Sequence, residues 1–141
     1  MTNTFKEDII IGEEAEYKIL SIIRKKYPKA YKMKGRFKPY DIYIPEIDSR
    51  IEVKRDIGSK NTSNFFIEYE CNYKPSGLSS TLADYWVIYD EDKFHFIKVP
   101  LLKTAAAHHG QEWEGTPSGG VSNVKAYLIS KELIKMCAKS I

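Results

Sequence analysis

Two short runs of alternating residues, separated by a turn-rich stretch, constrain the fold of this 141-residue chain more than any other part of its sequence. Residues 39–44 (PYDIYI) and 50–55 (RIEVKR) flank the segment PEIDS, which is the pattern of a β-hairpin. A four-residue loop over 45–48 would place Ile44 opposite Ser49. That single pairing fixes the partner of every other residue in the two strands.

In this register the hairpin has one apolar face and one charged face, because successive side chains of a strand point to opposite sides. The apolar face consists of Tyr40, Ile42, Ile51 and Val53. The other face brings together Asp41, Glu52 and Lys54, with Asp41 directly opposite Glu52. Directly opposed residues have Cβ atoms about 4.5–5.5 Å apart. The hydrophobic pattern and the pairing of the two carboxylates therefore select the same register.

Two carboxylates that lie this close repel each other and need positive charge nearby. Lys54 supplies one charge, and a divalent cation would supply the rest. Oxygen ligands with open water positions suit Mg²⁺, which prefers one or two carboxylates plus a phosphate. The plain alternative is a surface ion pair on a half-exposed strand, since a Glu-x-Lys sequence is common.

Helical and extended patterns alternate along the rest of the chain. Residues 5–27 predict a helix that ends at Pro28, with Glu16 at the edge of its apolar face. Further expected elements are a strand over 64–71, a loop over 74–81, a hairpin over 84–90 and 93–99, a short helix over 101–109, a Gly-rich loop over 110–120, a strand over 124–129 and a helix capped by Ser130. This order predicts an α/β fold, a single domain over 1–141 in which helices flank one central mixed β-sheet.

The composition narrows the class of protein. With 43% hydrophobic and 29% charged residues, the chain is suited to one hydrophobic core and does not have the composition of a disordered chain. It contains no apolar run long enough for a membrane span, and its first residues lack a secretion signal. Two cysteines make neither a disulfide framework nor a zinc cluster. We therefore expect a cytoplasmic protein with no membrane partner.

Positive charge gathers just before the hairpin. Between Arg24 and Lys38 there are eight basic residues and no acidic one, with aromatic residues among them. Basic side chains neutralise phosphates and aromatic rings stack on bases, so this composition is typical of a nucleic-acid-binding edge. The alternative is a solvated helix end followed by a loop.

The hairpin resembles a known signature. Pro39-Tyr40-Asp41, followed after ten residues by Glu52-Val53-Lys54, looks like the motif of the PD-(D/E)XK, or restriction-endonuclease-like, nucleases. Tyr40 separates Pro39 from Asp41, a departure that many members share. Gly12 and Glu16 are similar to the Gly-x-x-x-Glu that precedes the hairpin in several branches, including archaeal Holliday-junction resolvases. Residues 75–86 look like a stretch of small phage and prokaryotic members, and the resemblance covers roughly residues 5–100.

The resemblance implies a restriction-endonuclease-like core and a metal-dependent endonuclease that hydrolyses phosphodiester bonds with Mg²⁺ or Mn²⁺. It implies a metal held by Asp41, Glu52 and the Val53 carbonyl, with Glu16 contributing directly or through water. Lys54 would orient the attacking water. Many members place another polar residue on the third strand, for which we prefer Glu68 to Glu70 because Glu68 could lie beside Glu52 on the neighbouring strand.

The resemblance also bears on partners. The basic side chains that run toward Asp41 would contact the nucleic-acid backbone: Lys32, Lys34, Arg36 and Lys38. DNA is the usual substrate of the family, and a structure-dependent nuclease of the repair or recombination type fits the size of the chain. Many such cores form dimers, which leaves a homodimer open. Two alternatives also stay open: an RNA-cleaving member of the same fold, and a non-catalytic protein that binds nucleic acid.

Overall fold

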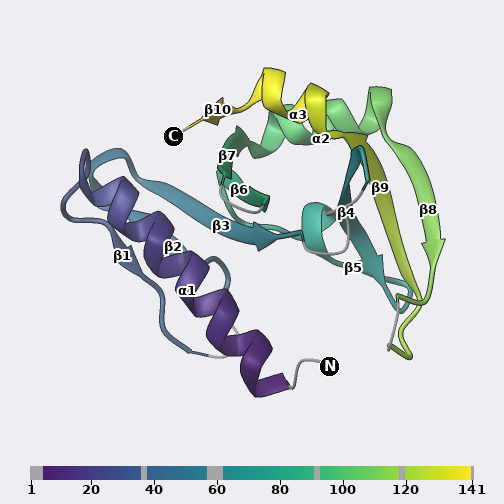
Figure 1. Ribbon diagram of the computed structural model, residues 1–141, viewed down its shortest axis with the longest axis horizontal. Coiled ribbons are helices and arrows are strands. Elements are labelled where there is room, and N and C mark those ends of the chain that lie inside the picture. The colour runs from purple at the N-terminus through teal and green to yellow at the C-terminus, as the bar shows by residue number, and fades with distance from the viewer. Residues whose placement is uncertain (1–4, 36–37, 57–61, 91–92, 118–119, 141) are drawn as a thin grey trace.

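Helices and strands of both kinds make up the computed structural model, which describes residues 5–35, 38–56, 62–90, 93–117 and 120–140 (Figure 1). The helices are α1 (Phe5–Arg24), α2 (Val99–His109) and α3 (Lys131–Cys137), with short 3₁₀ turns η1 (Pro45–Ile47) and η2 (Gly77–Ser79). The strands are β1 (Tyr31–Lys32), β2 (Ile42–Ile44), β3 (Ser49–Arg55), β4 (Asn64–Cys71), β5 (Lys74–Pro75), β6 (Tyr85–Asp90), β7 (Lys93–Lys98), β8 (Gln111–Gly115), β9 (Val124–Ser130) and β10 (Lys139–Ser140). The predicted α/β class is confirmed.

The first sheet has the strand order β1-β2-β3-β6-β7-β10 and is mixed, because β3 runs parallel to β6 while the other neighbours are antiparallel. Helix α1 covers one of its faces (Figure 1). Ile19 and Ile23 of the helix pack there against Ile42, Ile51 and Val87 of the strands. This packing explains the helix, since its apolar residues recur at helical spacing.

A second sheet, with the order β5-β4-β9-β8, is entirely antiparallel. Phe65 and Ile129 from this sheet meet Trp86 and Ile88 from the far face of the first sheet, and α2 and α3 complete the same core. The first sheet therefore lies between α1 and the second sheet with its helices. The expectation of one central sheet was wrong. The parallel strand β6 occupies the edge of β3 that β4 was expected to take, so β4 builds a sheet of its own.

Residues 110–120 also differ from expectation, because Gln111–Gly115 form strand β8 within the predicted Gly-rich loop. Trp113 pairs with Ala126 of β9 and is half-buried, whereas Glu112 and Glu114 are exposed. This is the alternation of an edge strand, and the flanking glycines hide it in the sequence.

Other boundaries shift by a few residues. Helix α1 ends at Arg24, before the expected residue 27, and α2 begins at Val99, before the expected residue 101. The C-terminal helix is confirmed, and the Ser130 hydroxyl accepts the Leu133 N–H at 3.4 Å. None of the helices in the described ranges combines the length and the apolar composition that a bilayer crossing requires.

Candidate active site

The predicted register of the β2–β3 hairpin is confirmed where the strands pair. Ile42 lies opposite Ile51 and Ile44 opposite Ser49, and η1 with Asp48 makes the four-residue loop. The paired part is shorter than expected, because β2 begins at Ile42 and not at residue 39. Pro39 has no N–H to donate to a longer ladder.

Asp41 lies just before β2 and contacts β3 through both its backbone and its side chain. Its backbone N–H donates to the Ile51 carbonyl at 2.9 Å, and its Oδ2 accepts the Val53 N–H at 2.6 Å. The expected direct pairing of Asp41 with Glu52 was therefore wrong. The Asp41 carboxylate bonds instead to the backbone of β3, as short acidic side chains readily do with nearby N–H groups. It still lies at the end of the hairpin where Glu52 is.

Glu16 joins this end of the hairpin from α1. It is buried on the helix face that meets the sheet, with 7% of its surface exposed. The pKa of Glu16 is raised, chiefly by burial and next by the Asp41 carboxyl beside it, while Lys38 opposes the rise. A buried carboxyl next to a second carboxyl is an arrangement that favours the protonated form or a bound cation.

Two lysines provide positive charge for these carboxylates. The Lys38 ammonium bridges them: it donates a short hydrogen bond to Glu16 and lies 3.3 Å from Asp41 Oδ1. Lys32 lies 3.6 Å from the other oxygen of Glu16. This pairing was not predicted from the sequence, although Lys38 stands only three residues before Asp41.

Glu52 and Lys54 lie on one face of β3, as predicted, with Lys54 Nζ 3.4 Å from Glu52 Oε2. The Lys54 ammonium also lies 5.2 Å from the ring centroid of Trp86 on the adjacent strand β6. Burial raises the pKa of Glu52; Lys54 opposes this rise, and the charge of Asp41 adds to it. Glu52 is therefore within electrostatic reach of Asp41 although the two do not pair directly.

This donor set suits a hard divalent cation. Glu16, Asp41 and Glu52 offer carboxylate oxygens, the ligands that Mg²⁺ prefers. The N–H and C=O of one strand residue point to the same side, so the Val53 carbonyl lies on the side from which Asp41 meets its N–H. In the part of the chain that the structure describes, no three acidic, His or Cys side chains are gathered around one point. The Lys38 ammonium stands between Glu16 and Asp41, so a divalent cation would have to replace it.

A β-bulge in β4 separates Glu68 from Glu70. The register with β9 shifts between them, so Glu68 lies opposite Ala126 while Glu70 lies opposite Lys125. Glu70 pairs with the Lys125 ammonium at 3.3 Å. Glu68 lines a cavity that Lys54 also lines, and it accepts a 2.8 Å hydrogen bond from the Ser76 hydroxyl. The expectation that Glu68 lies on the strand next to Glu52 was wrong. Glu68 instead faces Lys54 from the second sheet.

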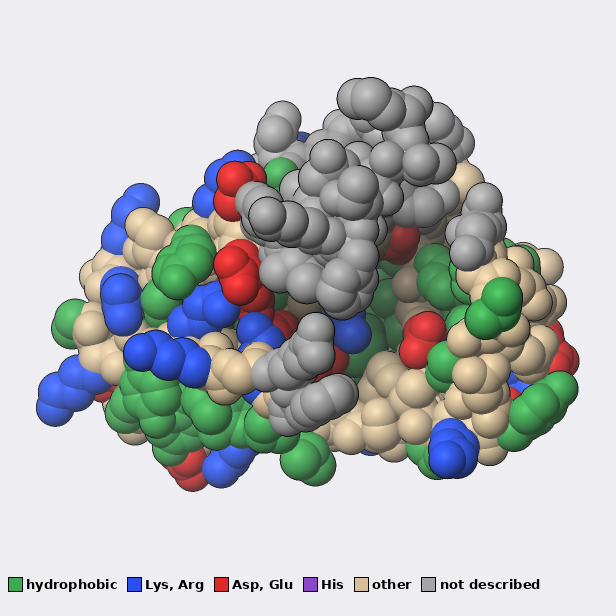
Figure 2. Space-filling view, turned by 90° about the horizontal axis from the view of Figure 1, so that it is seen from below, with side chains coloured by type: hydrophobic (Ala, Val, Ile, Leu, Met, Phe, Trp, Pro, Cys, Tyr) green, Lys and Arg blue, Asp and Glu red, His purple; other side chains and the backbone are tan. Residues whose placement is uncertain are grey.

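The basic side chains predicted to contact a backbone have different places. Lys32 and Lys38 are half-buried against the carboxylates, Lys34 is exposed, and Arg36 lies outside the described residues. Figure 2 shows basic and acidic side chains side by side on the left half of one face, next to a hollow near its middle. Their contact with phosphate stays a prediction.

Comparison with known proteins adds no relative: no protein-family model, curated protein or solved structure matches this chain.

Replacing Lys38 by methionine tests whether its ammonium and a divalent cation compete for one place. We expect K38M to lower the melting temperature without metal, because Glu16 and Asp41 then repel each other, and to enlarge the rise in melting temperature that Mn²⁺ causes. Tenfold tighter cation binding corresponds to about 1.4 kcal/mol, or about 3 to 6 °C for a chain of this size. Thermal unfolding with and without Mn²⁺ measures it. K34M, at an exposed lysine of the same segment, is the control, and an equal Mn²⁺ response in K38M and wild type would contradict the competition.

Proposed function

We propose that this protein is a metal-dependent nuclease with a restriction-endonuclease-like core, which hydrolyses phosphodiester bonds in DNA. One observation carries the proposal: Glu16 and Asp41 already hold a cation, the Lys38 ammonium, beside the Glu52–Lys54 pair at the end of the hairpin. A surface ion pair would not explain why a buried helix glutamate, Glu16, and Asp41, whose carboxylate bonds to the backbone of β3, share one ammonium.

Each residue has a role in this proposal. Glu16, Asp41 and Glu52, with the Val53 carbonyl, would hold Mg²⁺ or Mn²⁺. The metal would activate water and stabilise the negative charge that develops on the phosphate. Lys54, kept in place by Glu52 and the Trp86 ring, has donors for the attacking water or a phosphate oxygen. Glu68 would support Lys54 from the far side of the cavity that both line.

The charges near the site favour a nucleic-acid substrate. The exposed basic residues of the segment before the hairpin are Arg24, Lys25, Lys26, Lys29 and Lys34. Such side chains bind phosphates without regard to sequence and raise the rate of encounter with a polyanion. Cleavage of RNA by the same residues is the closest alternative, because nothing in this charge pattern distinguishes the two polymers.

A non-catalytic nucleic-acid-binding protein is the second candidate, and one observation favours it. Lys38 and Lys32 already pair with Glu16, so this buried carboxylate has cationic partners without a metal. A protein of this kind would bind nucleic acid in EDTA and would not cut it in Mg²⁺.

One gel experiment distinguishes these proposals. Labelled single-stranded, duplex and branched DNA and single-stranded RNA are incubated with the protein in Mg²⁺, Mn²⁺ or EDTA, beside E52Q, which keeps the shape of the side chain and removes its charge. We expect cleavage in Mg²⁺ or Mn²⁺ that EDTA abolishes and that E52Q lowers by at least about 100-fold, because even outer-shell changes at metal sites cost 10- to 100-fold.

The control is E46Q, at an exposed glutamate in the turn of the same hairpin. Cleavage by E52Q at the wild-type rate would point to a contaminating nuclease and would overturn the assignment of the site. Absence of cleavage by the wild type, together with tight binding in EDTA, would support the binding protein instead.

A further inference from the structure

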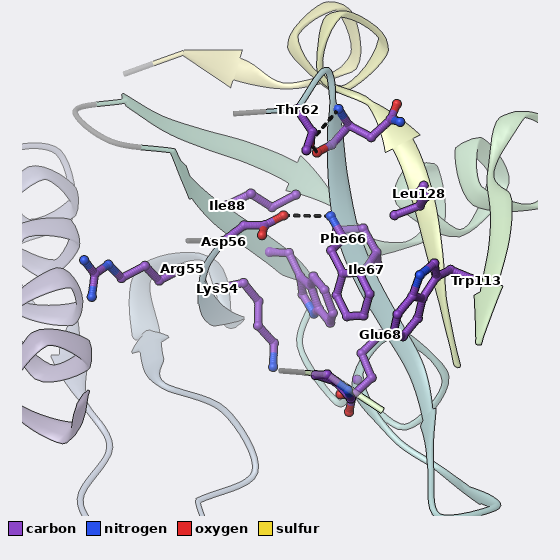
Figure 3. Close-up of a pocket in the computed structure, with 14 residues that line it drawn as sticks. Lys54, Arg55, Asp56, Thr62, Phe66, Ile67, Glu68, Ile88, Trp113 and Leu128 are labelled. Atoms are coloured by element: carbon purple, nitrogen blue, oxygen red, sulfur yellow. Dashed lines mark hydrogen bonds between the residues drawn. The ribbon is translucent and has the colours of Figure 1, made fainter. Parts of the chain in front are cut away.

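A cavity of about 620 Å³ opens between the two sheets, directly beside the proposed nuclease site (Figure 3). Its walls come from β3 and β6 of the first sheet on one side and from β4, β8 and β9 of the second sheet on the other. A volume of a few hundred cubic ångströms is that of a small-molecule binding site. The cavity is therefore large enough for one nucleobase.

Aromatic side chains form much of its wall. Phe66 and Trp113 meet edge to face with ring centroids 5.0 Å apart, on neighbouring parts of the second sheet. Trp86 closes the opposite side beneath Lys54. Trp86 is fully buried, whereas Phe66 and Trp113 are half-buried. Half-buried aromatic rings are the surfaces on which unstacked bases of single strands bind.

The cavity also offers hydrogen-bonding groups to a planar polar ring. The carboxylate of Glu68 lines it, with one oxygen accepting the Ser76 hydroxyl. Asn64, at the start of β4, lines it as well. A carboxylate acceptor and an amide-bearing residue beside aromatic rings match the hydrogen-bonding edges of nucleobases better than they match a purely apolar ligand.

Lys54 links the cavity to the proposed site of cleavage. It pairs with Glu52 at 3.4 Å and at the same time lines the cavity, where Figure 3 shows it facing the side of Glu68. Lys54 therefore touches both places. A nucleic-acid strand with a phosphate at Glu52 and Lys54 would have the mouth of the cavity within about one nucleotide of that phosphate. Cationic Lys54 at the rim suits the backbone beside an inserted base.

We infer that this cavity takes one unstacked nucleobase of the strand whose phosphate lies at Glu52, so that the substrate is nucleic acid with an unpaired nucleotide next to the point of cleavage. The inference rests on the proposed nucleic-acid function and makes it more specific. Fully paired duplex would have to pay the cost of unstacking and unpairing a base, which is least where the base is already unpaired.

The test measures binding in EDTA, so that it does not depend on cleavage. Two duplexes of the same sequence carry the fluorescent base 2-aminopurine, one at a paired position and one at a single unpaired nucleotide. We expect the wild type to bind the second duplex more tightly, with a change in 2-aminopurine fluorescence as the base stacks in the cavity. W113L should lose about 5- to 150-fold in affinity for it, which is the range that stacking of one base contributes.

Two further variants make the result specific. W113F keeps an aromatic ring and should retain most of the preference, whereas Y73L, at an exposed aromatic residue outside the cavity, should bind like the wild type. Circular dichroism checks that each variant is folded. If W113L does not fold, F66L provides a second change in the wall of the cavity.

The outcomes separate this inference from the proposed function. Metal-dependent cleavage with equal affinity for the two duplexes, or an unchanged preference in W113L and F66L, would overturn the base-binding cavity alone. Preference for the unpaired base without any cleavage would support the cavity and make the protein a binding module. Absence of binding to every nucleic acid would overturn both.

Discussion

Replacing Asp41 by asparagine is expected to abolish cleavage and leave the fold intact, whereas replacing it by alanine should damage both. The carboxylate has two separate tasks: Oδ2 accepts the Val53 N–H at 2.6 Å, and Oδ1 lies 3.3 Å from the Lys38 ammonium. Asparagine keeps an acceptor for the N–H but has no charge for a cation. We expect D41N to lower the rate of cleavage in Mg²⁺ by at least about 100-fold.

The alanine variant removes the acceptor as well. A partly buried N–H without a partner costs about 1–3 kcal/mol, so D41A should lower the free energy of unfolding by that amount and D41N by much less. Urea unfolding measures this difference in stability, and initial rates of cleavage measure the loss of activity in D41N. D48N, in the left-handed position of the hairpin loop where asparagine is well tolerated, is the matched control. Equal cleavage by D41N and wild type would exclude Asp41 as a cation ligand.

The hairpin could be predicted from the sequence because two independent constraints agree there. Ile42 and Ile51 had to share the core face, and a four-residue loop was the connection that allowed it. Helical periodicity also placed Glu16 at the edge of the apolar face of its helix, whereas its place beside the hairpin was expected only from the resemblance to the nuclease motif. The periodicity of the sequence was therefore sufficient to predict which face Ile42, Ile51 and Glu16 occupy.

The way in which Asp41 and Lys38 meet could not be predicted, because it depends on competition between partners in space. Alternation in the sequence says that Asp41 is on the charged face, but not that its side chain will displace a backbone partner of Val53. A lysine before the hairpin can turn toward phosphate in solvent or toward buried carboxylates. The burial of Glu16 decides between the two, since a desolvated carboxylate has the greater need for a cation.

Which strands pair with one another in the two sheets could not be predicted from the sequence either. The pattern of 64–71 correctly predicts a strand, yet an apolar alternating strand can add to either edge of a sheet or begin another. Pairing of β6 with β3 took the available edge and moved β4 to the second sheet. The space between the sheets, with Phe66, Trp113 and Glu68 in its wall, follows from this pairing, so the cavity could not be predicted from the sequence.

Replacing Gly77 by alanine is expected to destabilise the wall of this cavity more than any other change of a single methyl group. Gly77 has φ +49°, and a Cβ built there would lie 2.2 Å from the backbone oxygen of Glu68. The left-handed conformation costs a side chain about 1–2 kcal/mol and overpacking adds about 1–3 kcal/mol, so G77A should lose about 2–5 kcal/mol of unfolding free energy. Urea unfolding measures the loss.

The position of this clash makes the effect more than a loss of stability. The turn η2 begins at Gly77, directly after Ser76, whose hydroxyl holds the Glu68 carboxylate. Any relaxation that makes room for the methyl group must move η2 away from β4 and so release Glu68 from that hydrogen bond. G35A shows the effect of a positive φ without a clash, because a Cβ at Gly35 meets no described atom within 4 Å. A loss in G77A no larger than the roughly 1–2 kcal/mol of the left-handed conformation would mean that the close approach of η2 to β4 places no constraint on Glu68.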